Sequence, residues 1–471
     1  MEQKYYLSVD IGASSGRHML FCLDQGQIRM EEIYRFDNRL THVDGHLCWD
    51  VDYLFREIIN GMKKCQELHK LPTTMAIDTW AVDYVLVNKS GERLGQVYGY
   101  RDHRTDGMDK KLAKLISEDE LYARTGIQKQ IFNTIYQLMA DMKDRPELME
   151  EADTFLMLPD YFGYLLTGKM ASEYTNATST QLVDPITKTW NYDLMQILGI
   201  PDRIFLPLQQ PGYELGLIRQ GIADEVGYTC KVLLCASHDT ASAVMAMPDN
   251  KEDALYISSG TWSLMGVENP EAFCREKDRQ ENFTNEGGYE YRYRYLKNIM
   301  GLWMIQCVRH EFEDQYSFAQ LAQMARECYS IDSVVDVNDR RFLSPDSMTE
   351  AVKEYCRESG QKVPETINEL SKVIYVSLAI SYRDVIEAIE QNTGKTYRSI
   401  HIIGGGCKNE YLNQITADTT RRIVYAGPSE ATAIGNALAQ MIQAGDFTDL
   451  TDAREAVLNS FEIEQYVPEA F

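Results

Sequence analysis

A carboxylate in a setting suited to general-base chemistry lies in the segment Ser237-His238-Asp239-Thr240. Transfer of a phosphoryl group to a sugar hydroxyl needs a group that accepts the hydroxyl proton, and carboxylates commonly fill this role. Asp239 follows an apolar run at 231–235 and precedes a predicted helix, where the chain is expected to face a cleft. The alternative is structural, because Asp is also a favoured N-cap residue.

Two turns made of small and hydroxyl-bearing residues could hold phosphate groups, one at 13–17 and the other at 259–261. Backbone N–H groups approach a phosphate closely only where the side chains are absent or small. Asp10 ends the strand before the first turn and could hold Mg²⁺ through water, since Mg²⁺ usually keeps several waters. Each turn alone could be a simple β-hairpin. However, the two turns lie near the starts of two similar halves of the chain, and this repetition favours nucleotide binding.

A third turn, Gly404-Gly405-Gly406, follows an apolar strand and would let the backbone lie against a ligand, although a plain turn is the alternative. Asn409 stands where a dinucleotide-binding fingerprint needs its last glycine, so that fold is not supported. Two segments approach the P-loop pattern and are excluded. Residues 163–170 end in Met instead of Ser or Thr, and residues 389–396 begin with Ile instead of Gly.

Polar residues that could hold a polyol follow predicted strands. They lie at 78–83, at 101–104 and at Asn298. Aromatic side chains stand beside them, as Trp80 and Trp303 do, and an aromatic face next to polar groups is typical of sugar sites. For each tryptophan the alternative is packing in the core.

The elements expected around these residues begin as a βββαβ unit. We predict strands at 5–12, 18–24 and 27–35, a helix at 52–68, and strands at 74–79 and 84–88. The segment 109–171 is expected to be mostly helical. Strands at 254–258 and 262–267 repeat the opening, and a long helix at 364–391 and a strand at 399–403 follow. This repetition predicts an internal duplication with a boundary near 246–252, and therefore two α/β domains, 1–245 and 246–471, with a cleft between them.

Composition narrows the function classes. The chain has 471 residues, and its 47 Lys and Arg against 71 Asp and Glu give a net charge of −24. This charge argues against non-specific binding to nucleic acid or to anionic membranes, but not against ATP in a local cleft. We expect no signal peptide and no membrane span, since no charged start precedes a long apolar segment. Ten cysteines without a C-x-x-C pair indicate buried thiols in a cytoplasmic protein.

The sequence resembles the FGGY carbohydrate kinases of the actin-like ATPase superfamily in the segments that contain the candidate residues above. The resemblance runs from Asp10 to about Met441 and rests on whole stretches: 9–17, 77–83, 100–102, 158–162, 173–178, 236–244, 258–266, 285–288, 296–303 and 404–407. The turn at 12–17 and the stretch at 297–303 are similar to the branch of the family that acts on L-rhamnulose.

The resemblance implies a role for each matching position. Asp239 would accept the proton of the sugar hydroxyl at carbon 1. The sugar would also contact Ala81, His238, Thr240 and Asn298. ATP would be bound by Ala13, Ser14, Ser15, Gly16, Arg17, Thr261, Gln306 and Gly405, and Mg²⁺ would lie near Asp10.

The reaction implied by the resemblance is transfer of phosphate from ATP to L-rhamnulose, giving L-rhamnulose 1-phosphate and ADP in L-rhamnose catabolism. The implied fold is a pair of ribonuclease-H-like domains that close on ATP. The family has a glycine where this chain has Ala81, and the added methyl group narrows the sugar pocket. L-fuculose, L-ribulose and D-xylulose therefore remain alternative substrates. A non-catalytic ATP-binding sugar sensor is a further class, which the presence of Asp239 and the lack of a basic helix-turn-helix extension disfavour.

Overall fold

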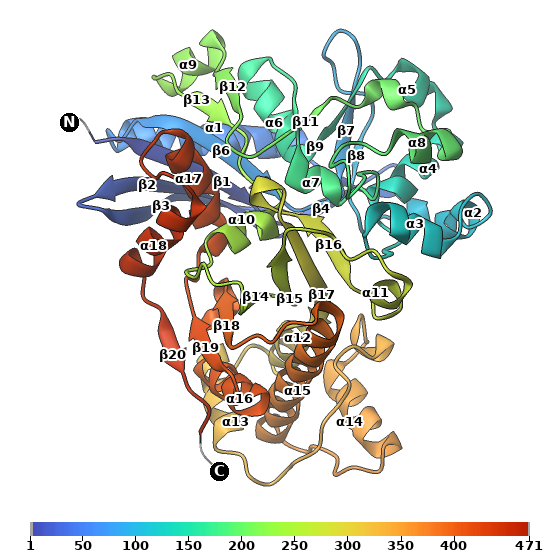
Figure 1. Cartoon of the computed structure of the whole chain (residues 1–471), viewed down its shortest axis with the longest axis vertical. Coiled ribbons are helices and arrows are strands. Elements are labelled where there is room, and N and C mark those ends of the chain that lie inside the picture. The colour runs from blue at the N-terminus through green and yellow to red at the C-terminus, as the bar shows by residue number, and fades with distance from the viewer. Residues whose placement is uncertain (1–2, 470–471) are drawn as a thin grey trace. The chain divides into compact units, whose positions relative to one another are not determined.

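The computed structural model describes residues 3–469, so the prediction about the start of the chain rests partly on residues outside this range. The chain divides into two compact units (Figure 1). Unit 1 comprises the described residues of Met1–Ala246 together with Glu268–Tyr295 and Thr432–Ser460. Unit 2 comprises Met247–Val267, Leu296–Ala431 and the described residues of Phe461–Phe471. Because two later segments join unit 1, the division into 1–245 and 246–471 stays a prediction.

A six-stranded sheet forms the centre of unit 1, in the order β12-β13-β6-β1-β2-β3. Its strands are β1 (Tyr5–Ile11), β2 (Ser15–Asp24), β3 (Gln27–Asp37), β6 (Pro72–Thr79), β12 (Glu214–Leu217) and β13 (Lys231–Leu233). Strand β1 pairs with β2 antiparallel and with β6 parallel, and the predicted strands of the opening are present, but two short strands at 40–43 and 46–49 also stand between β3 and the first helix. The central strands β1 and β6 are buried along nearly their whole length, as a sheet covered on both faces requires, whereas the edge strand β3 is partly exposed.

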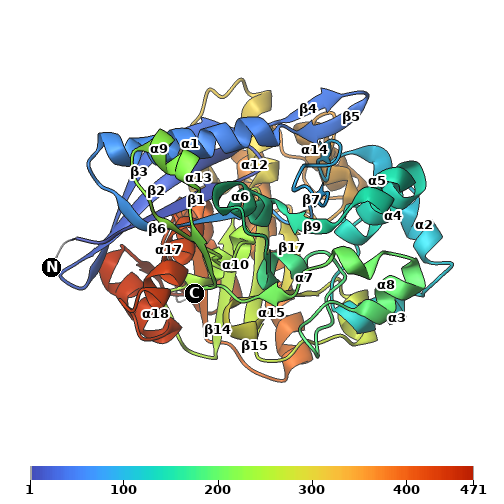
Figure 2. The ribbon, with the colours of Figure 1, turned by 90° about the horizontal axis from the view of Figure 1, so that it is seen from above.

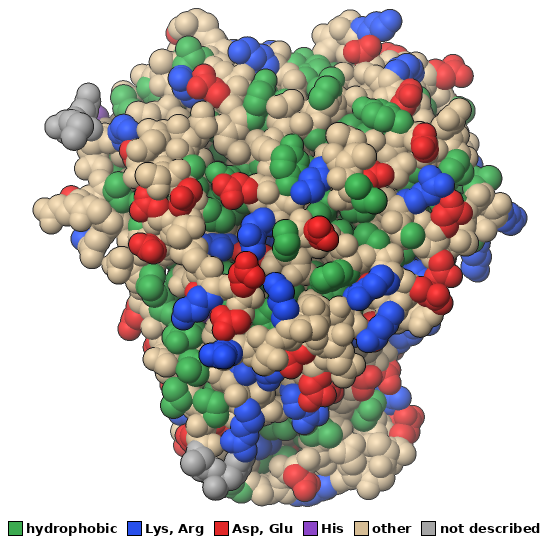
Figure 3. Space-filling view, in the orientation of Figure 1, with side chains coloured by type: hydrophobic (Ala, Val, Ile, Leu, Met, Phe, Trp, Pro, Cys, Tyr) green, Lys and Arg blue, Asp and Glu red, His purple; other side chains and the backbone are tan. Residues whose placement is uncertain are grey.

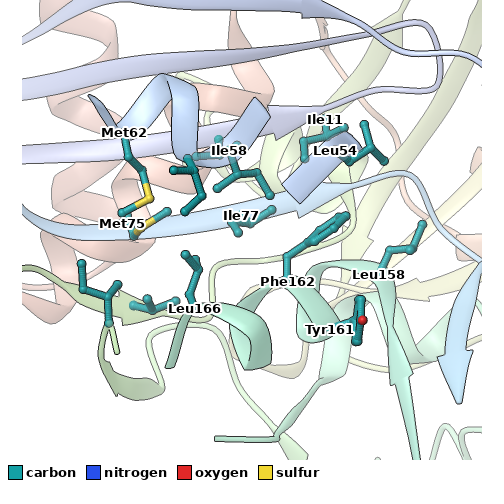
Figure 4. Close-up of a cluster of buried hydrophobic side chains, with 14 of the residues drawn as sticks. Ile11, Leu54, Ile58, Met62, Met75, Ile77, Leu158, Tyr161, Phe162 and Leu166 are labelled. Atoms are coloured by element: carbon teal, nitrogen blue, oxygen red, sulfur yellow. The ribbon is translucent and has the colours of Figure 1, made fainter. Parts of the chain in front are cut away.

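Helices cover both faces of this sheet. In α1 (Val51–Glu67), Asp50 caps the first turn by accepting a hydrogen bond from Tyr53 N, and Leu54, Ile58 and Met62 form the buried stripe. Figure 4 shows these side chains packed against β6 from one side and side chains of α6 (Leu158–Thr167) packed from the other. Burying each such side chain contributes about 1.5–3 kcal/mol. Helix α9 (Gln220–Val226) lies beside α1 (Figure 2).

The remaining elements of unit 1 include three small sheets and several short helices. The strands are β4 (Leu40–Val43), β5 (His46–Trp49), β7 (Tyr84–Val87), β8 (Val97–Tyr98), β9 (Thr154–Met157), β10 (Ser172–Glu173) and β11 (Leu208–Gln209). The helices are α2 (Met108–Leu112), α3 (Glu118–Thr125), α4 (Thr134–Asp144), α5 (Pro146–Glu151), α7 (Tyr174–Thr178), α8 (Tyr192–Leu198), α10 (Asp239–Met245), α11 (Glu276–Gln280) and α18 (Leu450–Ser460), together with α17 (Ala431–Gln443) from its second residue on. The segment 109–171 is mostly helical, as predicted. It also contains strand β9, whose four residues are too few for a strand to be recognised from its hydrophobic periodicity.

The second large sheet has the order β16-β17-β15-β14-β18-β19-β20, and the division between the units falls within β15 and β17. Its strands are β14 (Ala254–Ser259), β15 (Trp262–Asn269), β16 (Thr284–Gly287), β17 (Tyr293–Met300), β18 (Ser399–Ile403), β19 (Ile423–Ala426) and β20 (Glu464–Tyr466). Strand β14 pairs with β15 antiparallel and with β18 parallel, the same arrangement as β1 with β2 and β6. This repeated pairing supports the predicted duplication.

Unit 2 also carries α12 (Trp303–Glu311), α13 (Phe318–Arg326), α14 (Met348–Glu358), α15 (Ile367–Thr393) and α16 (Glu410–Thr420). The predicted long helix is α15, which Thr366 caps at its start and Gly394, at φ 69°, at its end. All ten cysteines are free thiols, and seven of them are buried as predicted, whereas Cys22, Cys274 and Cys307 are partly exposed. Acidic and basic side chains are interspersed on the face drawn in Figure 3. Within residues 3–469, no helix is long and apolar enough to cross a membrane.

Candidate active site

The segment that carries Asp239 is the junction between β13 and α10. His238 occupies the N-cap position and Asp239 is the first residue of the helix, so the interpretation of Asp239 as the helix cap is wrong. The Asp239 carboxylate accepts a hydrogen bond from Thr240 N at 2.6 Å, and 31% of its side chain is exposed. The carboxylate is therefore anchored on one side and accessible on another.

A buried carboxylate holds this junction in place. Glu173 accepts hydrogen bonds from Ser237 N at 3.2 Å and from Ser237 Oγ at 2.7 Å. The carbonyl of Ser237 accepts in turn from Thr79 N at 3.0 Å and from Asn176 Nδ2 at 3.2 Å. Burial raises the pKa of Glu173, and donors from several directions oppose that rise. These contacts fix the backbone from which Asp239 projects.

The environment of Asp239 tunes its proton affinity. Burial, followed by the nearby charge of Asp10, raises the pKa of Asp239 to about 7. The backbone N–H of Thr240 and the charge of Arg294 act in the opposite direction. A carboxylate with a pKa near neutral pH is well matched to accept a proton from a hydroxyl group.

Asp10 and Asp78 lie next to each other on β1 and β6, where they are register partners. Arg17 donates from Nε and Nη2 to Asp10 Oδ2, at 2.9 and 2.8 Å. Asn436 Nδ2 donates to Asp78 Oδ2 at 2.6 Å, whereas Asp78 Oδ1 is buried without a hydrogen-bond partner. Burial and the neighbouring Asp10 raise the pKa of Asp78. Such crowded carboxylates fit a divalent cation.

A cation here would depend largely on water and substrate for its ligands. Among residues 3–469, no group of three or more His, Cys, Asp or Glu side chains is arranged to hold a metal ion. Mg²⁺ commonly keeps several waters and binds through one or two carboxylates plus substrate phosphates. The unpartnered oxygen of Asp78 and the carboxylate of Asp10 therefore fit Mg²⁺ bound in that manner.

The turn predicted to bind phosphate joins β1 to β2 as a hairpin. Gly12 N donates to Ser15 O at 2.9 Å. Asn38 stabilises the turn by donating from Nδ2 to Gly12 O at 2.8 Å and from its backbone N to Ser14 O at 2.9 Å. Gly16 must lack a side chain, because a Cβ there would lie 2.1 Å from the Phe36 ring. Ala13 is partly exposed and Ser14 is exposed, so their backbone is open to a ligand.

Several residues considered for polyol binding are occupied by internal contacts. The carboxylate of Asp83 accepts hydrogen bonds from Trp49 Nε1 at 2.6 Å and from Trp80 Nε1 at 2.9 Å. It also accepts from Gln137 Nε2 at 3.0 Å. Trp80 is buried and packs on Trp49, which confirms its interpretation as a core residue. Ala81 is partly exposed beside this cluster.

The cavity in unit 2 brings together three residues that the sequence predicted for ATP. It measures about 740 Å³, and Thr261, Gln306 and Gly405 all line it. The lining also includes Leu302, Ile305, Phe318, Ala322, Tyr375 and Tyr411. This size and largely apolar lining, with a few polar groups, are typical of a small-molecule site. Asn298 also belongs to unit 2, and its Oδ1 is buried without a hydrogen-bond partner.

Three glycines follow one another at 404–406, and the second and third line the cavity. Gly404 has φ 84°, in the left-handed region, and a Cβ on Gly406 would lie 2.0 Å from Ser259 Oγ. At Gly405, a Cβ would meet nothing within 4 Å. The wall at Gly405 is therefore open to the cavity, and a ligand could lie flat against its backbone. This open backbone and the apolar lining fit the base and ribose of a nucleotide.

Arg294 and Glu286 were not predicted as site residues, although Glu286 lies in the stretch 285–288 that contributes to the family resemblance. Arg294 on β17 lies 3.0 Å from both His238 Nδ1 and Glu286 Oε2, and it donates to Thr240 Oγ1 at 2.6 Å. Both residues therefore contact the side chains that flank Asp239. A buried arginine gives no periodic signal of its own, since Arg is usually exposed.

Comparisons with known proteins identify relatives along nearly the whole chain. The chain is 48% identical to a rhamnulokinase from Oceanobacillus iheyensis over 98% of both chains. It is 45% identical to a rhamnulokinase from Bacillus subtilis over 98% of this chain and 95% of that protein. Among solved structures, a gluconate kinase from Lactobacillus acidophilus matches with a TM-score of 0.81 at 15% identity, over 99% of this chain and 94% of that one.

A glycerol kinase from Plasmodium falciparum, solved with ADP, matches with a TM-score of 0.80 at 12% identity, over 99% of this chain and 95% of that one. At such identities these structures establish the fold alone, a mixed α/β fold with two sheet-bearing domains as in the actin-like ATPases, which confirms the predicted fold class. The N-terminal domain model of the FGGY family matches residues 5–246, and the C-terminal domain model matches residues 255–444. The chain therefore belongs to the FGGY family of carbohydrate kinases.

Proposed function

We propose that the chain transfers the γ-phosphate of ATP to the carbon-1 hydroxyl of L-rhamnulose, giving L-rhamnulose 1-phosphate and ADP. The observation that carries the chemistry is Asp239, an accessible carboxylate with a pKa raised to about 7 at the head of α10. The sugar is suggested by the full-length relatives that are named rhamnulokinase.

At the sugar end, Asp239 is the proposed proton acceptor. As the hydroxyl oxygen attacks the γ-phosphorus, the bond from that phosphorus to the bridging oxygen of ADP breaks and ADP leaves with this oxygen. The hydroxyl proton passes to the carboxylate, which leaves Asp239 neutral and the sugar oxygen bonded to phosphate. His238 and Thr240 flank Asp239 and are proposed to orient the ketose, together with Ala81. Asn298 is a further proposed sugar contact, for which its unpartnered buried Oδ1 gives support.

At the nucleotide end, the unit 2 cavity is proposed to hold the base and ribose of ATP. Thr261, Gln306 and Gly405 line that cavity. The turn at 13–17 is proposed to hold the phosphates through its open backbone and hydroxyl groups. Asp10, with Asp78 beside it, is the proposed anchor of Mg²⁺. When bound, Mg²⁺ neutralises charge that develops on the transferring phosphoryl group.

The test is ADP release with Mg·ATP and five acceptors: L-rhamnulose, L-fuculose, L-ribulose, D-xylulose and glycerol. We expect the highest kcat/KM for L-rhamnulose. Preference for another ketose would overturn the substrate but leave the kinase chemistry. The absence of turnover with every acceptor would overturn the function and favour a sugar sensor.

The role of Asp239 is tested by Asp239→Asn, with Asp193→Asn as the matched control. Asp193 is an exposed residue in the first turn of α8, so its substitution removes the same charge away from the site. Asp239→Asn should lower kcat by about 10²–10⁴-fold, because the base is lost, while ATP binding measured by calorimetry stays within twofold. Turnover close to that of Asp193→Asn would contradict the assignment.

A further inference from the structure

Arg294 is a buried cation whose guanidinium joins the residues beside Asp239. Only 1% of its side chain is exposed. Besides its contacts with Thr240, His238 and Glu286, its Nε donates to Gly287 O at 3.2 Å. A charge buried this deeply requires such a set of partners, and two of its three nitrogens are directed to side chains proposed to contact the sugar.

The contact with His238 determines which ring nitrogen carries the proton. A guanidinium has donors and no acceptor, so His238 Nδ1, at 3.0 Å from Arg294 Nη2, accepts through its lone pair. Burial and the charge of Arg294 lower the pKa of His238 well below its ordinary value, which keeps the ring neutral. The single ring proton is then on Nε2. That nitrogen lies 3.1 Å from Thr240 Oγ1 and 3.4 Å from Asp239 Oδ1.

The same argument fixes the hydroxyl of Thr240. Its oxygen accepts from Arg294 Nη1 at 2.6 Å and from the protonated Nε2 of His238 at 3.1 Å. A hydroxyl group has two acceptor lone pairs and one donor. With both lone pairs used, the hydroxyl hydrogen points to a further acceptor.

One neighbouring group acts against this arrangement. Glu286 Oε2 on β16 lies 3.4 Å from His238 Nδ1 and would attract a proton to that nitrogen. Arg294 Nη2 donates to the same oxygen at 3.0 Å, so this carboxylate oxygen already accepts a hydrogen bond from Arg294. The charged groups that face the His238 ring are therefore Arg294 on β17, Glu286 on β16 and Asp239 on its own helix. Arg294 is the member of this set that excludes a proton from Nδ1.

We propose that Arg294 is a positioning residue that fixes the hydrogen-bond polarity of the sugar site. Through it, His238 Nε2 is held as a donor to Thr240 Oγ1, and the Thr240 hydroxyl is left as the outward donor beside Asp239. The inference rests on the proposed function, because it concerns the sugar end of that reaction. The Thr240 hydroxyl then donates to a ketose oxygen that accepts, while the Asp239 carboxylate, which only accepts, takes the hydroxyl that reacts.

The first test needs no activity and no substitution of Arg294. Protein labelled with ¹⁵N in its histidines is studied by NMR near neutral pH, and His238 is assigned from the signal lost in His238→Gln. We expect a neutral ring with an unprotonated Nδ1 and a protonated Nε2. A proton on Nδ1, or an imidazolium ring, would overturn the inference.

The second test compares Arg294→Lys with Arg422→Lys. A lysine ammonium keeps the charge but lacks the planar fork that reaches His238 and Thr240 together. We expect KM for the ketose to rise about tenfold or more, equivalent to about 1.4 kcal/mol, with KM for ATP within twofold, and His238 to populate both tautomers. Arg422 is also largely buried, with 16% of its side chain exposed, and it is paired with Glu390, so it controls for loss of a paired arginine.

The outcomes separate this inference from the proposed function. If Arg294→Lys leaves both the ketose KM and the His238 signal like those of the native chain, Arg294 has no positioning role. If Arg422→Lys raises the ketose KM equally, the effect comes from general destabilisation, which also overturns the inference. The ketose panel tests the function alone, whereas the protonation state of native His238 tests the hydrogen-bond assignment alone.

Discussion

The close packing of α17 on α10 makes Gly435→Ala a sensitive test of how unit 1 positions Asp239. A Cβ added at Gly435 would lie 1.7 Å from Ser242 O and 2.5 Å from Ser242 C. Both atoms belong to the backbone of α10, which begins at Asp239. No side-chain rotation can relieve the overlap, so the helices themselves must separate.

The size of the displacement follows from contact distances. Ordinary van der Waals contact begins at about 3.4 Å, so α10 and α17 must move apart by roughly 1.7 Å at this point. Ser242 is one helical turn from Asp239, so the shift reaches the carboxylate. A misplacement of about 1 Å can cost on the order of 10² in rate. Overpacking of this kind also destabilises a protein by about 1–3 kcal/mol, which lowers Tm by several degrees.

The assay measures kcat/KM for the ketose and Tm for Gly435→Ala and for Gly221→Ala. Gly221 lies in α9, and a Cβ there would meet nothing within 4 Å. The control should keep its activity and gain about 0.4–1 kcal/mol of stability, because alanine restricts the unfolded chain. Gly435→Ala should lose about 10²-fold in kcat/KM. If Gly435→Ala equals Gly221→Ala in both Tm and activity, the argument from helix contact is refuted.

Three further predictions follow from the site. First, kcat/KM for the ketose should rise with pH up to about 7, because Asp239 accepts a proton only when ionised and its pKa is raised to about 7; a pH profile with its acid limb near the ordinary carboxylate pKa would contradict this. Second, Gly405→Val places a side chain in the open space of the cavity and should weaken ATP binding by about tenfold or more in calorimetry (about 1.4 kcal/mol), while unchanged affinity would remove the cavity as the nucleotide site. Third, Asn436→Ala takes away the donor to Asp78 Oδ2 and should cost about 1–3 kcal/mol in urea unfolding; unchanged stability would mean that Asp78 does not depend on this bond.

The main strands and helices could be predicted because burial imposes a pattern on them. Strands β1 and β6 are buried along their length and read as apolar runs, and α1 shows one apolar stripe. The hairpin of β4 and β5 was missed. Its signal was present in Asp44-Gly45, which join the two strands at φ 50° and 86°, because an Asp-Gly pair favours such a two-residue turn.

A site residue could be predicted only where the sequence around it shows a recognisable pattern. Asp239 follows a strand, and Gly405 lies in a run of glycines, so each carried a signal in its own segment. Arg294 lies in the alternating run 291–295, Tyr-Arg-Tyr-Arg-Tyr, a pattern that would put Arg292 and Arg294 on the same face of a strand, although β17 begins only at Tyr293. Only tertiary structure distinguishes Arg294, with its side chain 1% exposed, from Arg292, with its side chain 37% exposed.

The proton affinity of Asp239 explains why Arg294 is paired with Glu286. Burial and Asp10 raise the pKa of Asp239, whereas Arg294 lowers it and Glu286 raises it again. An unpaired arginine would fix the polarity of the sugar site but would also stabilise the ionised Asp239 strongly and make it a weak base. With Glu286 at 3.0 Å from its guanidinium, Arg294 keeps its directional N–H donors while its net charge at Asp239 is reduced. Because of this pairing, Arg294 can orient its hydrogen-bond donors while Glu286 offsets its lowering of the pKa of Asp239.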